Sequence, residues 1–115
     1  MLKNELQRLF SLEGVKMVLV IDPEGRVRDE MGASNIEGEQ LAAVVSFVMA
    51  ESRAMATRLG QEQISMVFVE FRELALVSVP LKEAYFLVVI THAGANIGQI
   101  SYELKKYQDI SSGYT

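Results

Sequence analysis

The sequence predicts a single α/β (α+β) domain whose five-stranded, mostly antiparallel sheet carries helices on both faces. Three observations lead to this prediction. Short apolar runs rich in β-branched residues are typical of strands, whereas three other stretches have helical periodicity. The order of these segments is α-β-β-α-β-β-β-α. Most connections between strands are also too short for parallel crossovers, which need about a dozen residues or more.

The first predicted element is a short amphipathic helix that ends near Gly14. Its apolar residues Leu2, Leu6, Leu9 and Phe10 recur at helical spacing, with polar residues between them.

A hairpin is predicted next. Val15 to Ile21 is almost entirely apolar, which is typical of a strand buried on both faces. The sequence Asp22-Pro23-Glu24-Gly25 has the composition of a turn, because Pro fixes φ at its second position and Gly tolerates its last. Arg26 to Met31 then forms the more exposed return strand.

One long helix is predicted from Glu37 to Leu59, because this stretch lacks Pro and contains a single Gly near its start. Gly60 stands where a glycine commonly ends a helix. The remaining elements are three strands at Ile64 to Phe71, Leu74 to Val79 and Tyr85 to Thr91, and a last helix that opens at 94–96. The domain is expected to span residues 1–110, with a frayed tail at 111–115.

Both faces of the sheet need cover, because several strands are apolar on both sides. We expect the long helix on one face and the two terminal helices on the other.

The long helix has two apolar stripes when each residue is placed about 100° after the last. The expected core stripe is Leu41, Val44, Val45, Val48, Met55 and Leu59, with Ala42, Met49 and Ala56 at its edge. The second stripe is Ala43, Phe47, Ala50 and Ala54. A helix that only covers a sheet needs one stripe, so the second one predicts an interface. The alternative is that Ala is simply a good helix former at exposed positions, which leaves Phe47 unexplained.

The strand from Ile64 to Phe71 is a second candidate interface. It is apolar and lacks the Pro or Lys residues that protect an exposed sheet edge. If this strand lies at the edge, it should pair across a dimer axis, with Met66 and Phe68 at the contact. Since C₂ homodimers are the commonest soluble oligomers, a second copy of the chain is the expected partner.

The composition narrows the classes of partner and of site. A net charge of −4 and a pI near 5.0 argue against nucleic acid or an anionic membrane as the main partner. No apolar run approaches the ~20 residues that cross a membrane, so we expect a cytoplasmic protein without membrane insertion. The chain has no Cys, which removes disulfides and thiolate chemistry.

Few residues are candidates for catalysis or for a cofactor. His92 is the single histidine and follows an apolar strand, where it is expected to be an ordinary loop residue. The acids Asp22, Glu24, Asp29 and Glu30 gather near the hairpin without the spacing of an EF-hand loop. Gly94 to Gly98 opens a helix but matches neither a P-loop nor a dinucleotide fingerprint. We therefore assign no catalytic, cofactor-binding or metal-binding residue.

The chain resembles the roadblock family, named for roadblock-type dynein light chains, from about Leu6 to Tyr107. The segments that carry the resemblance are Gly14-Val15, Val20 to Val27, Gly38 to Ala43, Leu59-Gly60, Val67 to Glu70, Leu76 to Leu81, Leu87 to Ile90 and Ala95 to Ile100. Each is unspecific alone, but their order and spacing together are fairly specific.

The resemblance implies a homodimer in which the long helices pair and the strands after them join two sheets into one. Here these elements are Glu37 to Leu59 and Ile64 to Phe71. Family members bind small Ras-like GTPases as activators, exchange-factor components or scaffolds, and others attach cargo to dynein. The resemblance thus implies a GTPase regulator or scaffold without catalytic residues of its own. A small-molecule sensor is the alternative, and an enzyme is a third.

Overall fold

A computed structural model of the chain describes residues 2–32 and 35–108. The predicted tail at 111–115 lies outside the described residues. The elements, in chain order, are α1 (Leu2–Phe10), β1 (Val15–Ile21), β2 (Val27–Gly32), α2 (Gly38–Arg58), β3 (Val67–Glu70), β4 (Leu74–Pro80), a 3₁₀ turn η1 (Lys82–Ala84), β5 (Phe86–His92) and α3 (Ile97–Lys105). The predicted order of helices and strands is confirmed.

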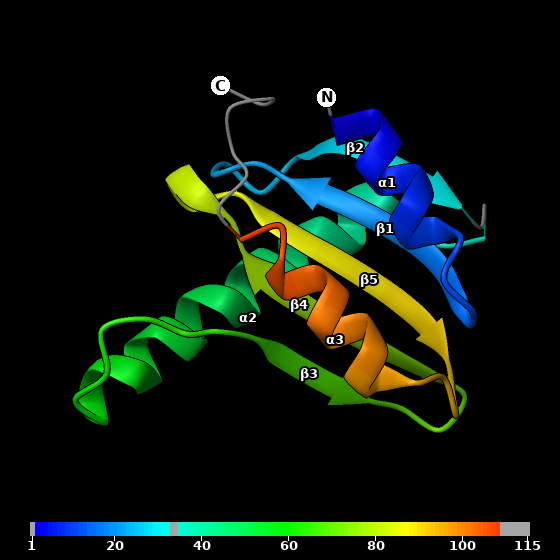
Figure 1. Cartoon of the computed structure of the whole chain (residues 1–115). Helices are drawn as coiled ribbons and strands as arrows, with labels where there is room; N and C mark the ends of the chain where they lie inside the picture. Colours follow the sequence, from blue (N-terminus) through cyan, green and yellow to red (C-terminus); the bar gives the residue numbers. More distant parts are fainter. Residues whose placement is uncertain (1, 33–34, 109–115) are drawn as a thin grey trace.

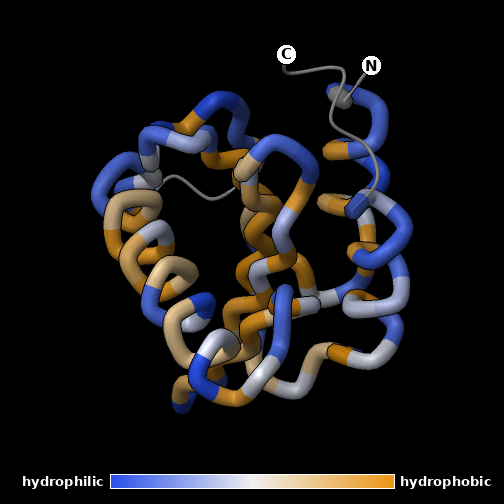
Figure 2. The backbone as a smooth tube through the Cα atoms, turned by 90° about the vertical axis from the view of Figure 1, so that its left-hand side faces the viewer, coloured by the Kyte–Doolittle hydropathy of each residue, from blue (hydrophilic) through white to orange (hydrophobic). Residues whose placement is uncertain are grey.

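The five strands form one antiparallel sheet in the order β2-β1-β5-β4-β3. Helix α2 lies behind the sheet in Figure 1, and α1 and α3 lie in front of it. Figure 2 shows the same three layers edge-on, with the most apolar backbone in the middle layer. The predicted fold class and the predicted division of the helices between the two faces are both confirmed.

The sheet separates two apolar cores. The core under α1 and α3 contains Leu6, Leu9, Val77, Ile100 and Leu104, among others. The core under α2 contains Met17, Leu19, Val45, Met49 and Val88, among others. Alternate residues of β1 and β5 enter opposite cores, which explains why both strands are apolar along nearly their whole length.

The end of α2 follows from Gly60, whose φ is +73°. The amide of Gly60 donates to the carbonyl of Thr57, and the amide of Gln61 donates to that of Ala56. This pair of bonds is a Schellman motif, in which a left-handed residue turns the chain back over the last helical turn. The chain then returns toward the sheet along residues 61–66.

Several predicted boundaries need correction. Helix α1 ends at Phe10 rather than near Gly14, and strands β2, β4 and β5 shift by one residue at one or both ends. Helix α2 covers Gly38–Arg58, one residue less at each end than predicted. Strand β3 covers only Val67–Glu70, whereas Ile64 to Phe71 was expected. The register pairs Val67 with Ser78, so Ser65 would fall opposite Pro80, which has no amide to donate. At the other end, the amide of Phe71 bonds to the carbonyl of Leu74 and opens the turn to β4.

The turn between β1 and β2 depends on Asp22, which is buried. Its Oδ1 accepts bonds from the amides of Glu24 and Arg26 at 2.9 and 3.0 Å, and its Oδ2 lies 3.9 Å from the Arg28 guanidinium. Asp22 is therefore a structural acid that holds the turn, and its carboxylate is already occupied.

Replacing Asp22 tests this assignment. We expect Asp22→Ala to lower the free energy of unfolding by about 2 kcal/mol, because two backbone amides lose a charged acceptor that is itself buried. Asp22→Asn keeps the Oδ1 acceptor and should cost about half as much. Urea denaturation measures both variants, and equal losses would show that the amide bonds to Oδ1 do not stabilise the turn.

Candidate dimer and partner interface

Helix α2 presents a different side to the sheet from the one predicted. Its buried residues are Gly38, Ala42, Val45, Met49 and Ala56. Three residues assigned to the core stripe, Val44, Met55 and Leu59, are instead 60%, 58% and 69% exposed. The side that meets the sheet is centred on Val45 and Met49, with Ala42 and Ala56 beside them. The apolar side chains about a quarter turn away around the helix are left exposed on one flank.

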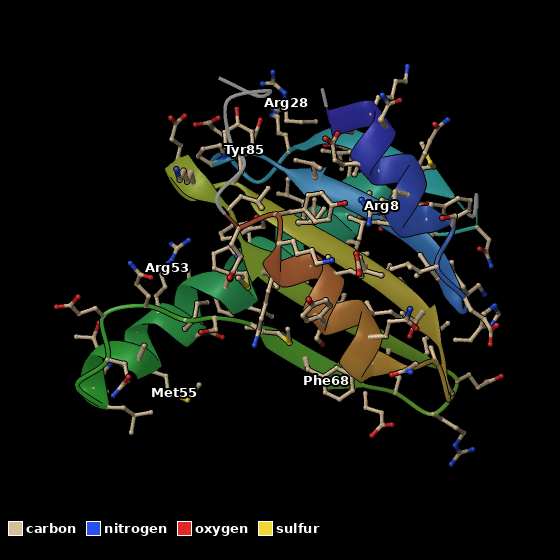
Figure 3. The ribbon with its side chains drawn as sticks, in the orientation of Figure 1. Arg8, Arg28, Arg53, Met55, Phe68 and Tyr85 are labelled. Carbon is tan, nitrogen blue, oxygen red and sulfur yellow. The ribbon has the colours of Figure 1, made fainter. Side chains whose placement is uncertain are left out.

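This flank, which we call the α2 flank, consists of Val44, Val48, Met55 and Leu59. It faces the side of the molecule on which β3 lies: Met55 and Leu59 border a depression of about 470 Å³ that Ile64, Met66 and Val67 also line. Figure 3 shows Met55 pointing toward that side and Arg53 pointing the opposite way. On the Arg53 side, the guanidinium lies over the ring of Phe86 at 5.2 Å.

The stripe predicted as an interface, Ala43, Phe47, Ala50 and Ala54, lies on the side of α2 turned away from the sheet. We call it the outer ridge. Phe47 is 66% exposed, and the three alanines are exposed or half-buried. On the helical wheel, Gln40, Glu51 and Arg58 lie between the outer ridge and the α2 flank, so α2 carries two separate apolar surfaces besides its buried side.

Strand β3 is an edge strand, as the prediction of a pairing strand required. Its side chains alternate between the two cores: Val67 packs against the core under α2, and Met66 packs against the core under α1 and α3. The Ser101 hydroxyl lies 3.5 Å from the Met66 sulfur, which ties the start of β3 to α3. Phe68 is opposite Val77, a residue of the core under α1 and α3, and it is 44% exposed.

The six predicted interface residues thus fall into two groups. Ala43, Phe47, Ala50 and Ala54 are on the outer ridge of α2, and Met66 and Phe68 are on the opposite face of the sheet. Sequence reasoning missed the α2 flank, because its residues have the same hydrophobicity as core residues on a helical wheel.

Two further depressions are lined partly by polar residues. One, of about 580 Å³, shares Gln63, Ile64 and Ser65 with the depression beside the α2 flank, and residues of both charges, including Arg53, Glu62 and Lys82, also line it. The other, of about 390 Å³, lies where His92 ends β5 and Asn96 caps α3. The Asn96 side chain accepts a bond from the amide of Gln99 at 3.0 Å, which confirms its capping role.

The titratable groups do not assemble a metal site in the part of the chain that the structure describes. Within residues 2–32 and 35–108, His, Asp and Glu form no group of three that could hold an ion. Burial raises the pKa of the Tyr107 phenol, and the positive charge of the nearby Arg8 partly offsets this rise. Tyr107 belongs to the core under α1 and α3, so this shift reflects packing. No described helix is long and apolar enough to cross a membrane.

Solved structures share this fold. MglB of Myxococcus xanthus superposes with a TM-score of 0.81 at 24% identity, covering 89% of this chain and 77% of that one. The gliding protein MglB of Thermus thermophilus gives 0.85 at 21%, covering 93% and 82%. A Roadblock/LC7 domain of Streptomyces avermitilis gives 0.83 at 18%, covering 96% and 92%. At these identities the likeness concerns the fold.

The sequence itself assigns the family. No curated protein matches the chain. Residues 1–91, however, match the Roadblock/LC7 domain, and this match extends from α1 through most of β5. The chain therefore belongs to the Roadblock/LC7 domain family.

Proposed function

We propose that this chain is a homodimeric, non-catalytic regulator or scaffold that binds a small Ras-like GTPase. The observation that carries the proposal is the apolar surface of α2 beside an unprotected edge strand, in a chain of the Roadblock/LC7 family. A monomer gains nothing from exposing Val44, Phe47, Met55 and Leu59 together on one helix.

The homodimer is supported by the position of two surfaces on one side of the molecule. The free edge of β3 and the α2 flank both face the same side. A two-fold axis beside β3 would therefore extend the sheet into a second copy and bring the two α2 helices together through their flanks. Both contacts would bury apolar side chains and satisfy backbone groups that an edge leaves open.

The outer ridge would have a different role in such a dimer. Its residues point away from the sheet, so two helices that pack side by side leave both ridges on the outer surface of the helix pair. Phe47 would then be an aromatic anchor for a second kind of partner, since aromatic residues dominate many protein interfaces. We propose the GTPase as that partner. The assignment of Ala43, Phe47, Ala50 and Ala54 to the dimer contact stays a prediction that the variants below also test.

The homodimer is tested with a charge placed on the α2 flank. We expect the native chain to be a dimer at micromolar concentration by multi-angle light scattering. Met55→Glu should raise the dissociation constant at least about a hundredfold, because each copy would bury an unpaired carboxylate. Thr57→Glu places the same charge two residues along, on an exposed position of the same helix, and should leave the dimer intact. A native chain that is monomeric under these conditions would contradict the homodimer.

The GTPase contact is tested with Phe47→Glu. The native chain should bind a small Ras-like GTPase of its own organism, loaded with GDP or with a non-hydrolysable GTP analogue, in calorimetry. Phe47→Glu should weaken that binding about tenfold or more and leave the dimer in place. If the Phe47→Glu variant is monomeric, the outer ridge belongs to the dimer contact and not to the GTPase contact. If the native chain retains no GTPase in either nucleotide state, the proposed partner is wrong.

A further inference from the structure

The backbone of β3 determines which of its residues can pair with a second copy. The amide of Phe71 bonds to the carbonyl of Leu74, so this pair is hydrogen-bonded in the β3–β4 hairpin. In an antiparallel ladder, hydrogen-bonded pairs alternate with pairs that are not. The backbone groups of Val67 and Val69 therefore point toward β4. Those of Phe68 and Glu70 point outward to the free edge.

Symmetry restricts the register further. When a two-fold axis relates two antiparallel strands, one residue lies opposite its own copy. The axis can pass beside Val67, Phe68, Val69 or Glu70. An axis at Glu70 would place two like charges opposite each other, which destabilises a strand pair. An axis at Val69 would set the exposed ring of Phe68 against a carboxylate of Glu70. An axis at Val67 would set that ring opposite Met66, whose side chain already packs against the core under α1 and α3 and lies beside Ser101.

We propose that the two copies pair with Phe68 opposite Phe68 of the partner subunit. This inference rests on the homodimer proposed above and adds the register of its sheet. The outward amides and carbonyls of Phe68 and its copy then bond to each other at the axis. The two rings meet on the sheet face that carries α3, where each ring is 44% exposed in a single copy. Aromatic pairs directly across two strands are among the favourable cross-strand contacts.

The same register completes the opposite face of the sheet. Val67 of one copy falls opposite Val69 of the other, on the face that carries α2. Both residues are half-buried in one copy. The pair would lie beneath the two α2 flanks, so the strand contact and the helix contact would share one apolar layer. Phe68 is therefore assigned a positioning role: it sets the strand register that brings the helices together.

Single cysteines test the register without altering Phe68, because the chain has no cysteine of its own. Val67→Cys and Val69→Cys are made separately and oxidised alone or as an equimolar mixture after subunit exchange. In the proposed register, residues 67 and 69 of different copies are about 4.5 Å apart between Cα atoms. Residue 67 and its own copy are more than about 8 Å apart, beyond the roughly 4.4–6.8 Å that a disulfide spans. The mixture alone should form a cross-linked 67–69 species.

Each other result overturns the proposal in a distinguishable way. Cross-linking of Val69→Cys alone places the axis at Val69, and cross-linking of Val67→Cys alone places it at Val67. A dimer by light scattering without any cross-link overturns the register at Phe68, and leaves either an axis at Glu70 or a joining element other than β3. A monomer in light scattering removes the homodimer itself, and the register with it.

The aromatic contact has a test of its own. Phe68→Ala should raise the dimer dissociation constant about tenfold, because both rings of the pair are lost. Phe71→Ala removes another exposed ring, one whose backbone faces β4, and should change the constant less than about threefold. Sedimentation equilibrium measures both, and equal effects of the two variants would show that Phe68 holds no special position at the axis.

Discussion

The pairing of β1 with β5 in the middle of the sheet is the constraint on which the other features depend. Both strands are apolar on both sides, and Val18, Val20 and Val88 are fully inaccessible to solvent. Such strands are stable only when both faces of the sheet are covered. The three helices supply that cover, with α2 on one face and α1 and α3 on the other. Covering the centre leaves the two edge strands, β2 and β3, of which β3 is the more apolar.

The open edge at β3 explains why α2 has exposed apolar side chains on the flank toward that strand. A helix that covers the middle of a sheet needs apolar residues on one side only. Helix α2 buries Val45 and Met49 there, with the small residues Ala42 and Ala56 beside them. Its large apolar side chains, among them Met55 and Leu59, are exposed on the flank toward β3. A second copy that continued the sheet at β3 would also bring its own helix to this flank, so one association would complete both layers.

The elements were predictable from local signals, whereas the phase of the long helix was not. β-branched runs, the Asp22 turn and the Gly60 helix end are properties of neighbouring residues, and each appears where the sequence predicts it. The phase of α2 depends on which apolar residues meet the sheet, and that is a tertiary property. A helical wheel does not distinguish apolar residues that face the core from apolar residues that face a partner. The predicted core stripe therefore fell between the true core, centred on Val45 and Met49, and the exposed flank.

The short length of β3 has a related cause, and it bears on how the edge can be used. Local propensity favoured a strand from Ile64 to Phe71, but β4 pairs with only its middle part, because Pro80 offers no amide. The backbone groups of Met66, like those of Phe68, point outward to the free edge. In the proposed register a second copy would place Glu70, not a proline, opposite Met66. The strand can therefore be longer in an assembled sheet than in one copy. In the proposed homodimer a second copy would pair with the part of this strand that β4 leaves unpaired, whereas the single chain forms only the part that β4 can pair.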